Sequence, residues 1–268
     1  MQKAPVSVII PCYCCSETIE RTVLSVIHQS LSPAEILLVD DCSNDGGRTL
    51  STLHRLQEAG ERNGQIVKVI LLAHNSGPGG ARNAGWQIAR SPLIAFLDAD
   101  DTWHPRKIEI QCRWMELRPD VVLTAHLSER IGPGGSVPDL PTDVSARRIT
   151  RTGLLLSNGL PTRSVMLRRG IAFRFEAAKR RAEDYLLWLK IVLTGNPAWR
   201  LELPLAYSHK PAFGSGGLSR DLWKMEMGEL DTYRRLYQEQ MISLLPFAGL
   251  GLLSLTKHFR RVLLTYFR

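Results

Sequence analysis

Three carboxylates stand close together directly after an apolar run in the first half of the chain. Asp98, Asp100 and Asp101 follow the segment LIAFL at 93–97. Acids this close repel one another unless a cation neutralises them, and oxygen ligands favour hard cations such as Mg2+ or Mn2+, commonly completed by phosphate oxygens. The pattern predicts a divalent metal at Asp98 and Asp100 that binds a nucleoside diphosphate. The alternative is local capping, with Asp98 in a turn and Asp101 at the start of the next helix.

A second pair of acids opens a predicted helix over 182–193. Glu183 and Asp184 stand at its first positions, where the helix dipole favours negative charge. The functional interpretation is a general base at the mouth of the site, within reach of an acceptor hydroxyl. Trp188 lies one turn along on the same face, where it would stack on a sugar, although an aromatic residue at helical spacing is more often part of a core.

A glycine-rich segment, GPGGAR at 77–82, also follows a strand and opens a helix. It lacks the third glycine of the dinucleotide fingerprint and follows the third strand instead of the first, which disfavours a nicotinamide cofactor. Arg82 offers a planar fork for a diphosphate or a base. Asp40 and Asp41 follow another strand, where a carboxylate accepts hydrogen bonds from a base N–H or ribose hydroxyls, or stabilises a turn.

These side chains must be positioned by the elements between them. Short β-branched runs alternate with helical patterns, which predicts βαβ units, an α/β fold and a parallel sheet whose strand ends carry the ligand site. The segment from 150 to 175 is less regular. The predicted strands are 6–10, 35–39, 66–72, 93–97, 121–125, 164–168, 198–203 and 206–209. The predicted helices are one that runs to 27 after an N-cap at Ser16, and others over 45–59, 77–90, 104–117 and 182–193.

The net charge and the cysteine content limit the kinds of partner and the compartment that we expect. The net charge of +8 suits nucleic acid, an anionic membrane surface or phosphorylated substrates. No zinc-finger spacing or aromatic ribonucleoprotein motif is present, so nucleic acid is disfavoured. The five cysteines favour reduced thiols, and the first apolar run is too short for a signal peptide. We therefore expect the catalytic part to lie in the cytoplasm.

The tail differs from the rest of the chain. An amphipathic, charged helix is predicted over 222–240, and 241–255 carries no charge before the basic KHFRR. A membrane-spanning helix needs roughly 20 apolar residues, so this stretch suits a helix at an anionic membrane surface. A helix packed on the domain or on a second subunit remains the alternative. The predicted division is a domain over 1–215 and a helical extension over 216–268.

Five motifs in this order resemble family 2 glycosyltransferases. The resemblance covers roughly residues 5–215 and implies a GT-A nucleotide-diphospho-sugar transferase fold, a Rossmann-like α/β fold with a mostly parallel sheet. It also implies an inverting transfer from a nucleoside-diphosphate sugar to a glycan or lipid-linked acceptor, in surface polysaccharide or lipid-linked glycan synthesis. The motifs are VSVIIPCY at 6–13 with Glu17, LVDDCSNDGG at 38–47, NSGPGGARNAG at 75–85, IAFLDADDTWHP at 94–105 with Lys107 and Gln111, and AEDYLLWLK at 182–190.

The resemblance assigns roles residue by residue. Asp98 contacts ribose or metal, Asp100 binds the metal, Asp184 is the base and Glu183 supports it. His209 falls where the family often has a histidine near the phosphates, and a structural histidine is the alternative. Cys14 stands where the family usually has Asn, which puts that loop's nucleotide contacts in doubt. The nucleotide pocket implied by the likeness is lined by Pro11, Tyr13, Glu17, Asp41 and Arg82.

Two other functions remain open at this stage. A sugar nucleotidyltransferase would more naturally carry a glycine-rich basic loop directly after the first strand, where this chain has PCYCCSE. A sugar-nucleotide-binding module without transfer activity would be favoured by loss of Asp100 or Asp184, and both are present.

Overall fold

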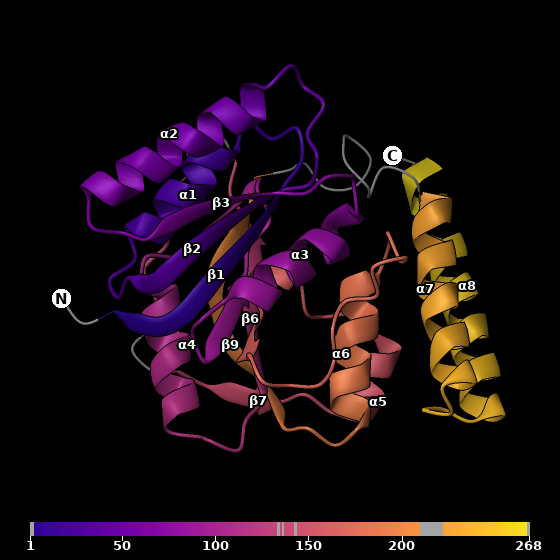
Figure 1. The fold of residues 1–268 in the computed structure, drawn as a ribbon. Coiled ribbons are helices and arrows are strands. Elements are labelled where there is room, and N and C mark those ends of the chain that lie inside the picture. Colours follow the sequence, from indigo (N-terminus) through magenta and orange to yellow (C-terminus); the bar gives the residue numbers. More distant parts are fainter. Residues whose placement is uncertain (1–2, 133–134, 136, 142–143, 210–221, 267–268) are drawn as a thin grey trace.

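The computed structural model describes residues 3–132, 135, 137–141, 144–209 and 222–266 (Figure 1). In the first half, every predicted strand and helix is present within a few residues of its expected ends. The helix predicted from an N-cap at Ser16 instead begins at Ile19, after Thr18. The elements are β1 (Ala4–Cys12), α1 (Ile19–Ile27), β2 (Pro33–Asp40), α2 (Arg48–Arg62), β3 (Val67–Leu71), α3 (Gly77–Ile88) and β4 (Leu93–Phe96).

The second half contains short elements that periodicity did not reveal, namely β5, β7, α5 and a 3-10 turn. The two strands predicted over 198–203 and 206–209 are one strand, β9. Proline lacks the N–H of a ladder bond, but Pro204 lies where the register between β9 and β6 shifts, so the strand continues past it. The elements are β5 (Asp101–Trp103), α4 (Lys107–Glu116), β6 (Leu123–Arg130), β7 (Ala146–Arg148), α5 (Arg151–Leu156), the turn Thr162–Ser164, β8 (Met166–Arg168), α6 (Glu183–Leu193), β9 (Ala198–Ser208), α7 (Leu222–Gln238) and α8 (Leu244–Tyr266).

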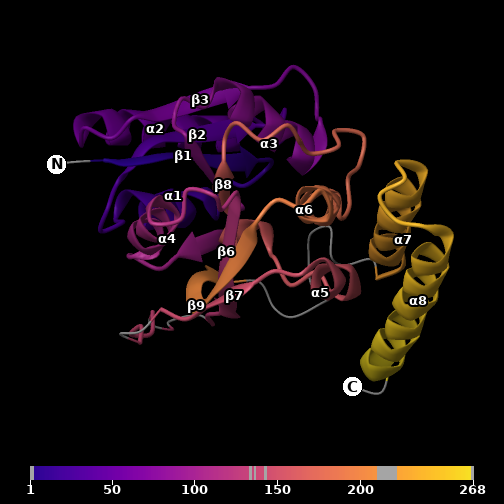
Figure 2. The same cartoon turned by 90° about the horizontal axis from the view of Figure 1, so that it is seen from below.

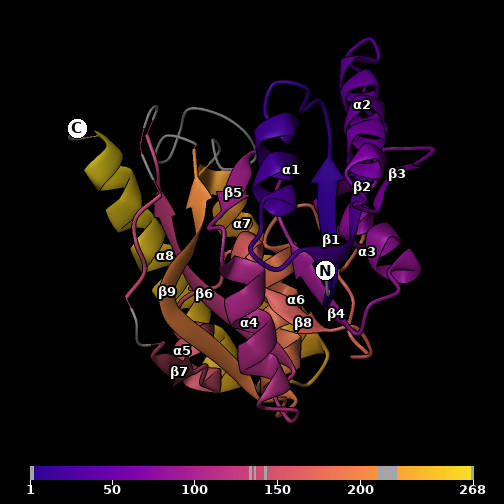
Figure 3. The same cartoon turned by 90° about the vertical axis from the view of Figure 1, so that its left-hand side faces the viewer.

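One mixed sheet unites the described strands in the order β3-β2-β1-β4-β8-β6-β9-β5, with β7 paired to β9. Strands β1 to β4 are mutually parallel where they pair, and β6 is parallel to β9. Strand β8 runs antiparallel between β4 and β6. The arrowheads of β1 and β9 therefore point the same way (Figure 3). The sheet is mostly parallel, as expected.

Both faces of the sheet are covered, because successive side chains of the central strands are apolar on either side. Val8 and Ile10 of β1 pack with α1, α2 and α4, whereas Ile9 packs with α3 and α6. Figure 2 shows α1 and α4 on one side of the sheet, α6 on the other, and α7 and α8 beyond α6. The result is a three-layer α/β/α arrangement with an added helical hairpin.

The hairpin of α7 and α8 packs directly on this domain. Tyr233 and Leu236 are buried in the same apolar cluster as α6. The ammonium of Lys179, 3% exposed, pairs with Asp231 at 3.0 Å and donates to the Gly228 carbonyl at 2.7 Å. None of the helices in the described part of the chain is long and apolar enough to cross a membrane. The expected boundary near 215 falls within 210–221, outside the described residues, so the two-part division stays a prediction.

Candidate active site

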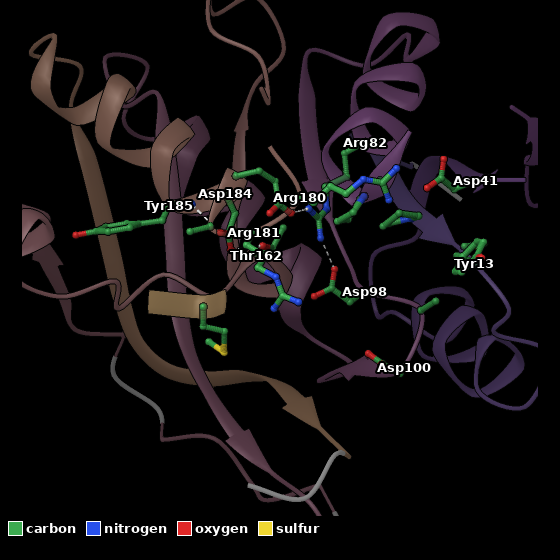
Figure 4. Close-up of a pocket in the computed structure, with 18 of the residues that line it drawn as sticks. Tyr13, Asp41, Arg82, Asp98, Asp100, Thr162, Arg180, Arg181, Asp184 and Tyr185 are labelled. Carbon is green, nitrogen blue, oxygen red and sulfur yellow. Dashed lines mark hydrogen bonds and ion pairs between the residues drawn. The ribbon is translucent and has the colours of Figure 1, made fainter. Parts of the chain in front are cut away.

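A cavity of about 1150 Å³ opens at the carboxyl ends of β1 and β4 (Figure 4). Its walls come from the loop after β1, the acidic turn after β4, and the N-terminal ends of α3 and α6. Residues of the segment 157–162 and of the helical hairpin line the rest. The cavity is therefore lined both by the predicted site residues at the strand ends and by residues of the C-terminal tail.

A buried arginine lies at the centre of this cavity. Arg82 of α3 bonds Asp98 Oδ1 through Nη2 at 2.7 Å and Glu183 Oε1 through Nη1 at 2.9 Å (Figure 4). Burial lowers the pKa of Arg82, but Asp98 and Glu183 outweigh it and the pKa rises. Burial and the neighbouring Asp184 in turn raise the pKa of Glu183, against the effect of Arg82. Arg82 thus joins the end of β4 to the start of α6.

The predicted base has a defined orientation. Asp184 lines the cavity, and its Oδ2 accepts a hydrogen bond from the Thr162 hydroxyl at 2.8 Å. Its Oδ1 accepts from the backbone N–H of Tyr185 at 2.7 Å. Thr162 belongs to the 3-10 turn in the segment that lacks periodicity, so sequence patterns gave no signal for it.

The acidic turn after β4 splits its three carboxylates. Asp98 and Asp100 line the cavity, whereas Asp101 is buried in β5 and pairs with Arg163 at 3.0 Å. Burial, together with Asp98 and Asp100, raises the pKa of Asp101 to about 7 although Arg163 opposes this. Asp101 does not begin α4, so the capping alternative for it is wrong.

The described residues include no group of three or more His, Cys, Asp or Glu side chains that could hold a metal alone. Asp98 and Asp100 nevertheless fit a hard cation, because both carboxylates line the cavity and carboxylate oxygens are ligands such ions prefer. Oxygens of a bound diphosphate would have to complete the coordination. The site therefore fits a metal that arrives together with its nucleotide.

The end of the cavity near β1 and β2 carries the expected nucleotide residues. Pro11, Tyr13 and Asp41 all line it, and Tyr13 is 48% exposed. Asp41 Oδ1 accepts from the backbone N–H of Ser76 at 2.6 Å, and burial raises the pKa of Asp41 despite this bond. Arg180, which the sequence analysis did not single out, donates to the Asn75 side chain here at 2.8 Å.

Three predicted residues lie elsewhere. Glu17 is exposed and absent from the lining. Trp188 is fully buried, with its ring 6.3 Å from Phe96 and 5.8 Å from Phe175, so its assignment to sugar stacking is corrected to a core role. His209 also lies outside the lining.

His209 is held close to the acidic turn by a different contact. Its Nε2 lies 2.8 Å from the Thr102 hydroxyl. Burial lowers the pKa of His209, and Arg21 adds to this while Asp100 opposes it. This contact with β5, outside the cavity lining, favours the structural alternative for His209.

The loop after β1 holds the cysteine at the position where the resemblance expects Asn. Cys14 lines the cavity with a left-handed φ of 46°, and its backbone N–H donates to the Ser43 hydroxyl at 2.9 Å. Its thiol lies 3.2 Å from Asn44 Oδ1. The cysteine therefore supports the loop through contacts with the turn after β2.

The end of the cavity away from β1 and β2 is formed by the residues that follow α5 and by the hairpin. Asn158, Met225, Glu229 and Lys257 line it, and Lys257 donates to the Leu156 carbonyl. The sequence gave no reason to place the tail beside Asp184, because its pattern describes one helix face and not what that face packs against.

The comparisons with known proteins decide the family. The model of glycosyl transferase family 2 matches residues 7–180. The chain belongs to this family. It is a glycosyltransferase, and its topology is that of the GT-A fold.

Curated relatives are similar over different lengths. The UDP-Glc:alpha-D-GlcNAc-diphosphoundecaprenol beta-1,3-glucosyltransferase WfgD of Escherichia coli is 31% identical over 191 residues, 71% of each chain. TuaG of Bacillus subtilis (strain 168), named for teichuronic acid biosynthesis, is 42% identical over 113 residues, so the chain spans only 42% of that protein.

Two solved structures share the fold at low identity. Staphylococcus aureus TarS 1–349 superposes with a TM-score of 0.67 at 23% identity, over 97% of this chain and 72% of that one. The mannosyltransferase PcManGT of Pyrobaculum calidifontis, in complex with GDP-Man and Mn2+, gives 0.67 at 16%, over 94% and 69%.

Replacing the central arginine tests the site's electrostatics. Arg82→Leu leaves the buried Glu183 carboxylate unpaired, and we expect the free energy of unfolding to fall by about 3 kcal/mol, since breaking a buried pair costs roughly 3–5 kcal/mol and Asp98 reaches solvent. Urea denaturation measures this. The double variant Arg82→Leu/Glu183→Gln should recover part of the loss. Equal stability of the single variant and the wild type would show that the pair has no structural role.

Proposed function

We propose that the protein transfers a sugar, with inversion and with a divalent metal, from a nucleoside-diphosphate sugar to a hydroxyl acceptor in surface polysaccharide or lipid-linked glycan synthesis. One observation carries the proposal: Asp184 lines the same cavity as Asp98 and Asp100, with Arg82 and Glu183 between them. A base and a pair of metal-type ligands in one cavity are what this reaction requires.

The donor fits the end of the cavity beside β1 and β2. Asp41 and Tyr13 line this end and would contact the base and ribose, and the acidic turn would face the diphosphate (Figure 4). A TarS structure similar in fold holds UDP-GlcNAc, and PcManGT holds GDP-Man. These titles support a nucleotide-sugar donor for this chain without choosing its base.

Asp98 and Asp100 would hold a Mn2+ or Mg2+ ion at the diphosphate. The ion would supply positive charge to the departing nucleoside diphosphate, which is the main electrostatic requirement of the transition state. Arg82 orients the Asp98 carboxylate for this role through the 2.7 Å bond between them.

Asp184 would take the proton of the acceptor hydroxyl. In Figure 4 it lies on the opposite side of Asp98 from Tyr13 and Asp41. A single displacement requires the acceptor to attack from the side away from the leaving group, so a base opposite the nucleotide end supports inversion. Glu183 would support the base indirectly. Its carboxylate pairs with Arg82, so the neighbouring Asp184 is the acid that remains available to the acceptor.

The hairpin end of the cavity would receive the acceptor. About 1150 Å³ exceeds the 300–1,000 Å³ typical of one small ligand, which leaves room for a second substrate. WfgD is named for a diphosphoundecaprenol-linked acceptor. We extend this to a glycan or lipid-linked acceptor, and we place the protein peripherally on the cytoplasmic face of a membrane.

The hairpin also presents apolar side chains to the outside. Leu245 is 85% exposed, Leu252 is 67% exposed and Phe259 is 62% exposed. The basic Lys257 and Arg260 lie on the same helix. Apolar residues beside cations on one helix suit an anionic membrane surface.

A donor panel tests the reaction. The protein incubated with UDP-, GDP- or TDP-sugars and Mn2+ should release a nucleoside diphosphate from one of them, and EDTA should stop the release. Asp100→Asn should lower the rate by about 100-fold or more, because a group that stabilises the leaving diphosphate is lost. Tight donor binding with no release would support a binding module, and formation of a nucleotide sugar from a nucleoside triphosphate would support a nucleotidyltransferase.

A second variant separates the base from the donor site. Asp184→Asn should lower kcat by about 10²- to 10⁴-fold, the usual contribution of a general base, while the donor dissociation constant stays unchanged. Steady-state kinetics and calorimetry measure the two quantities. A large loss of donor affinity would mean that Asp184 binds the donor and is not the base.

Vesicle binding tests the membrane surface. Leu245→Glu and Leu252→Glu should each weaken binding to phosphatidylglycerol vesicles by at least about tenfold, because burying a leucine contributes about 1.5–3 kcal/mol. Leu117→Glu is the matched control, since Leu117 is 78% exposed after α4, away from the hairpin. If all three variants bound vesicles as well as the wild type, the result would favour the alternative that the hairpin only packs on the domain.

A further inference from the structure

A single 3-10 turn, Thr162–Ser164, contacts both the proposed base and the buried acid that follows the two carboxylates after β4. Consecutive residues of the turn reach opposite groups. Thr162 bonds the proposed base, and Arg163 bonds the acid that ends the metal-binding turn. The turn therefore links the proposed base to the segment that carries Asp98 and Asp100.

The hydrogen bond from Thr162 restricts the orientation of the Asp184 carboxylate. An aspartate in the first turn of a helix commonly bonds that helix's own N–H groups. Here Oδ1 does so with Tyr185, and the Thr162 hydroxyl donates to Oδ2 at 2.8 Å. Because Thr162 is only 5% exposed, its hydroxyl has little freedom to turn elsewhere. The bond therefore sets the direction of the carboxylate within the cavity.

Arg163 fixes the same turn to the acidic segment. Its Nη1 pairs with Asp101 Oδ2 at 3.0 Å and its Nε donates to the Ser128 hydroxyl at 2.7 Å. Its carbonyl accepts from Trp103 Nε1 at 2.8 Å. From α4, the side-chain amide of Gln111 donates to the Ser164 carbonyl at 3.1 Å. Residues 101–111 thus hold the backbone that presents Thr162.

We propose that Thr162 is a positioning residue for Asp184, and that Arg163 ties this position to the acidic turn, so that one short segment sets the base relative to the metal ligands. The proposal rests on the proposed function, because it presumes that Asp184 takes the acceptor proton. Neither residue needs to touch a substrate.

The test removes the hydroxyl and keeps the shape. Thr162→Val should lower kcat by about 10- to 100-fold, since misplacing a catalytic group by about 1 Å costs on the order of 100-fold, while the donor dissociation constant stays unchanged. Thr162→Ser, which restores the hydroxyl, should recover most of the rate. In an Asp184→Asn background, Thr162→Val should cause no further loss, because residues that act as a unit are not additive.

A control in the same turn separates positioning from stability. The Ser164 hydroxyl bonds the Pro161 carbonyl and contacts neither acid, so Ser164→Ala should lower the melting temperature but retain kcat. An equal kcat loss in Ser164→Ala, or full activity in Thr162→Val, would overturn the proposal. A wild-type protein that transfers no sugar from any donor would instead refute the proposed function, which keeps the two failures distinct.

Discussion

The site depends on a guanidinium that compensates acids brought together from distant parts of the chain. The described lining of the cavity holds six acidic and four basic residues, a formal excess of two negative charges. At its centre, Arg82 bonds both Asp98 and Glu183 while only 4% exposed. Without it, the carboxylates at the end of β4 and the start of α6 would repel each other with no positive charge between them. The remaining excess is what a divalent cation would neutralise.

The parallel strands explain why the wall of the cavity formed by β1, β2 and β4 could be predicted. Parallel strands place their carboxyl ends at one edge, so acids following 39 and 97 must approach one another wherever the βαβ pattern holds. The pattern holds through β4, and Asp41, Asp98 and Asp100 indeed share one cavity. The identity of Arg82's partners could not be predicted, because Glu183 lies 101 positions away in sequence.

Asp184 and Glu183 were also predicted, but other parts of the site were not, for two physical reasons. Helical spacing shows that Trp188 shares a face with Asp184, but α6 is buried on nearly every side, so spacing could not tell core from cavity. Thr162 and Arg163 occupy a turn held by side-chain bonds from β5, β6 and α4 rather than by a repeating pattern. Sequence patterns reveal elements whose buried residues recur at a regular spacing. A turn fixed by tertiary hydrogen bonds has no such spacing, so it could not be predicted.

For the hairpin, the sequence pattern and the structure each supply part of the argument. The tail pattern indicates a helix suited to a membrane surface, and the structure adds that α8 also reaches the cavity through Lys257. Leu252 precedes Lys257 by five positions, about 7.5 Å along a helix axis. A bilayer that buries Leu252 would therefore lie within about two helical turns of the cavity wall. For the proposed acceptor, joined to a lipid by a diphosphate, this geometry would keep the lipid in the membrane while its sugar reached Asp184. A free polysaccharide acceptor would gain nothing from a nearby membrane. Membrane binding through the exposed face of α8 would therefore support a lipid-linked acceptor and would not distinguish between donors.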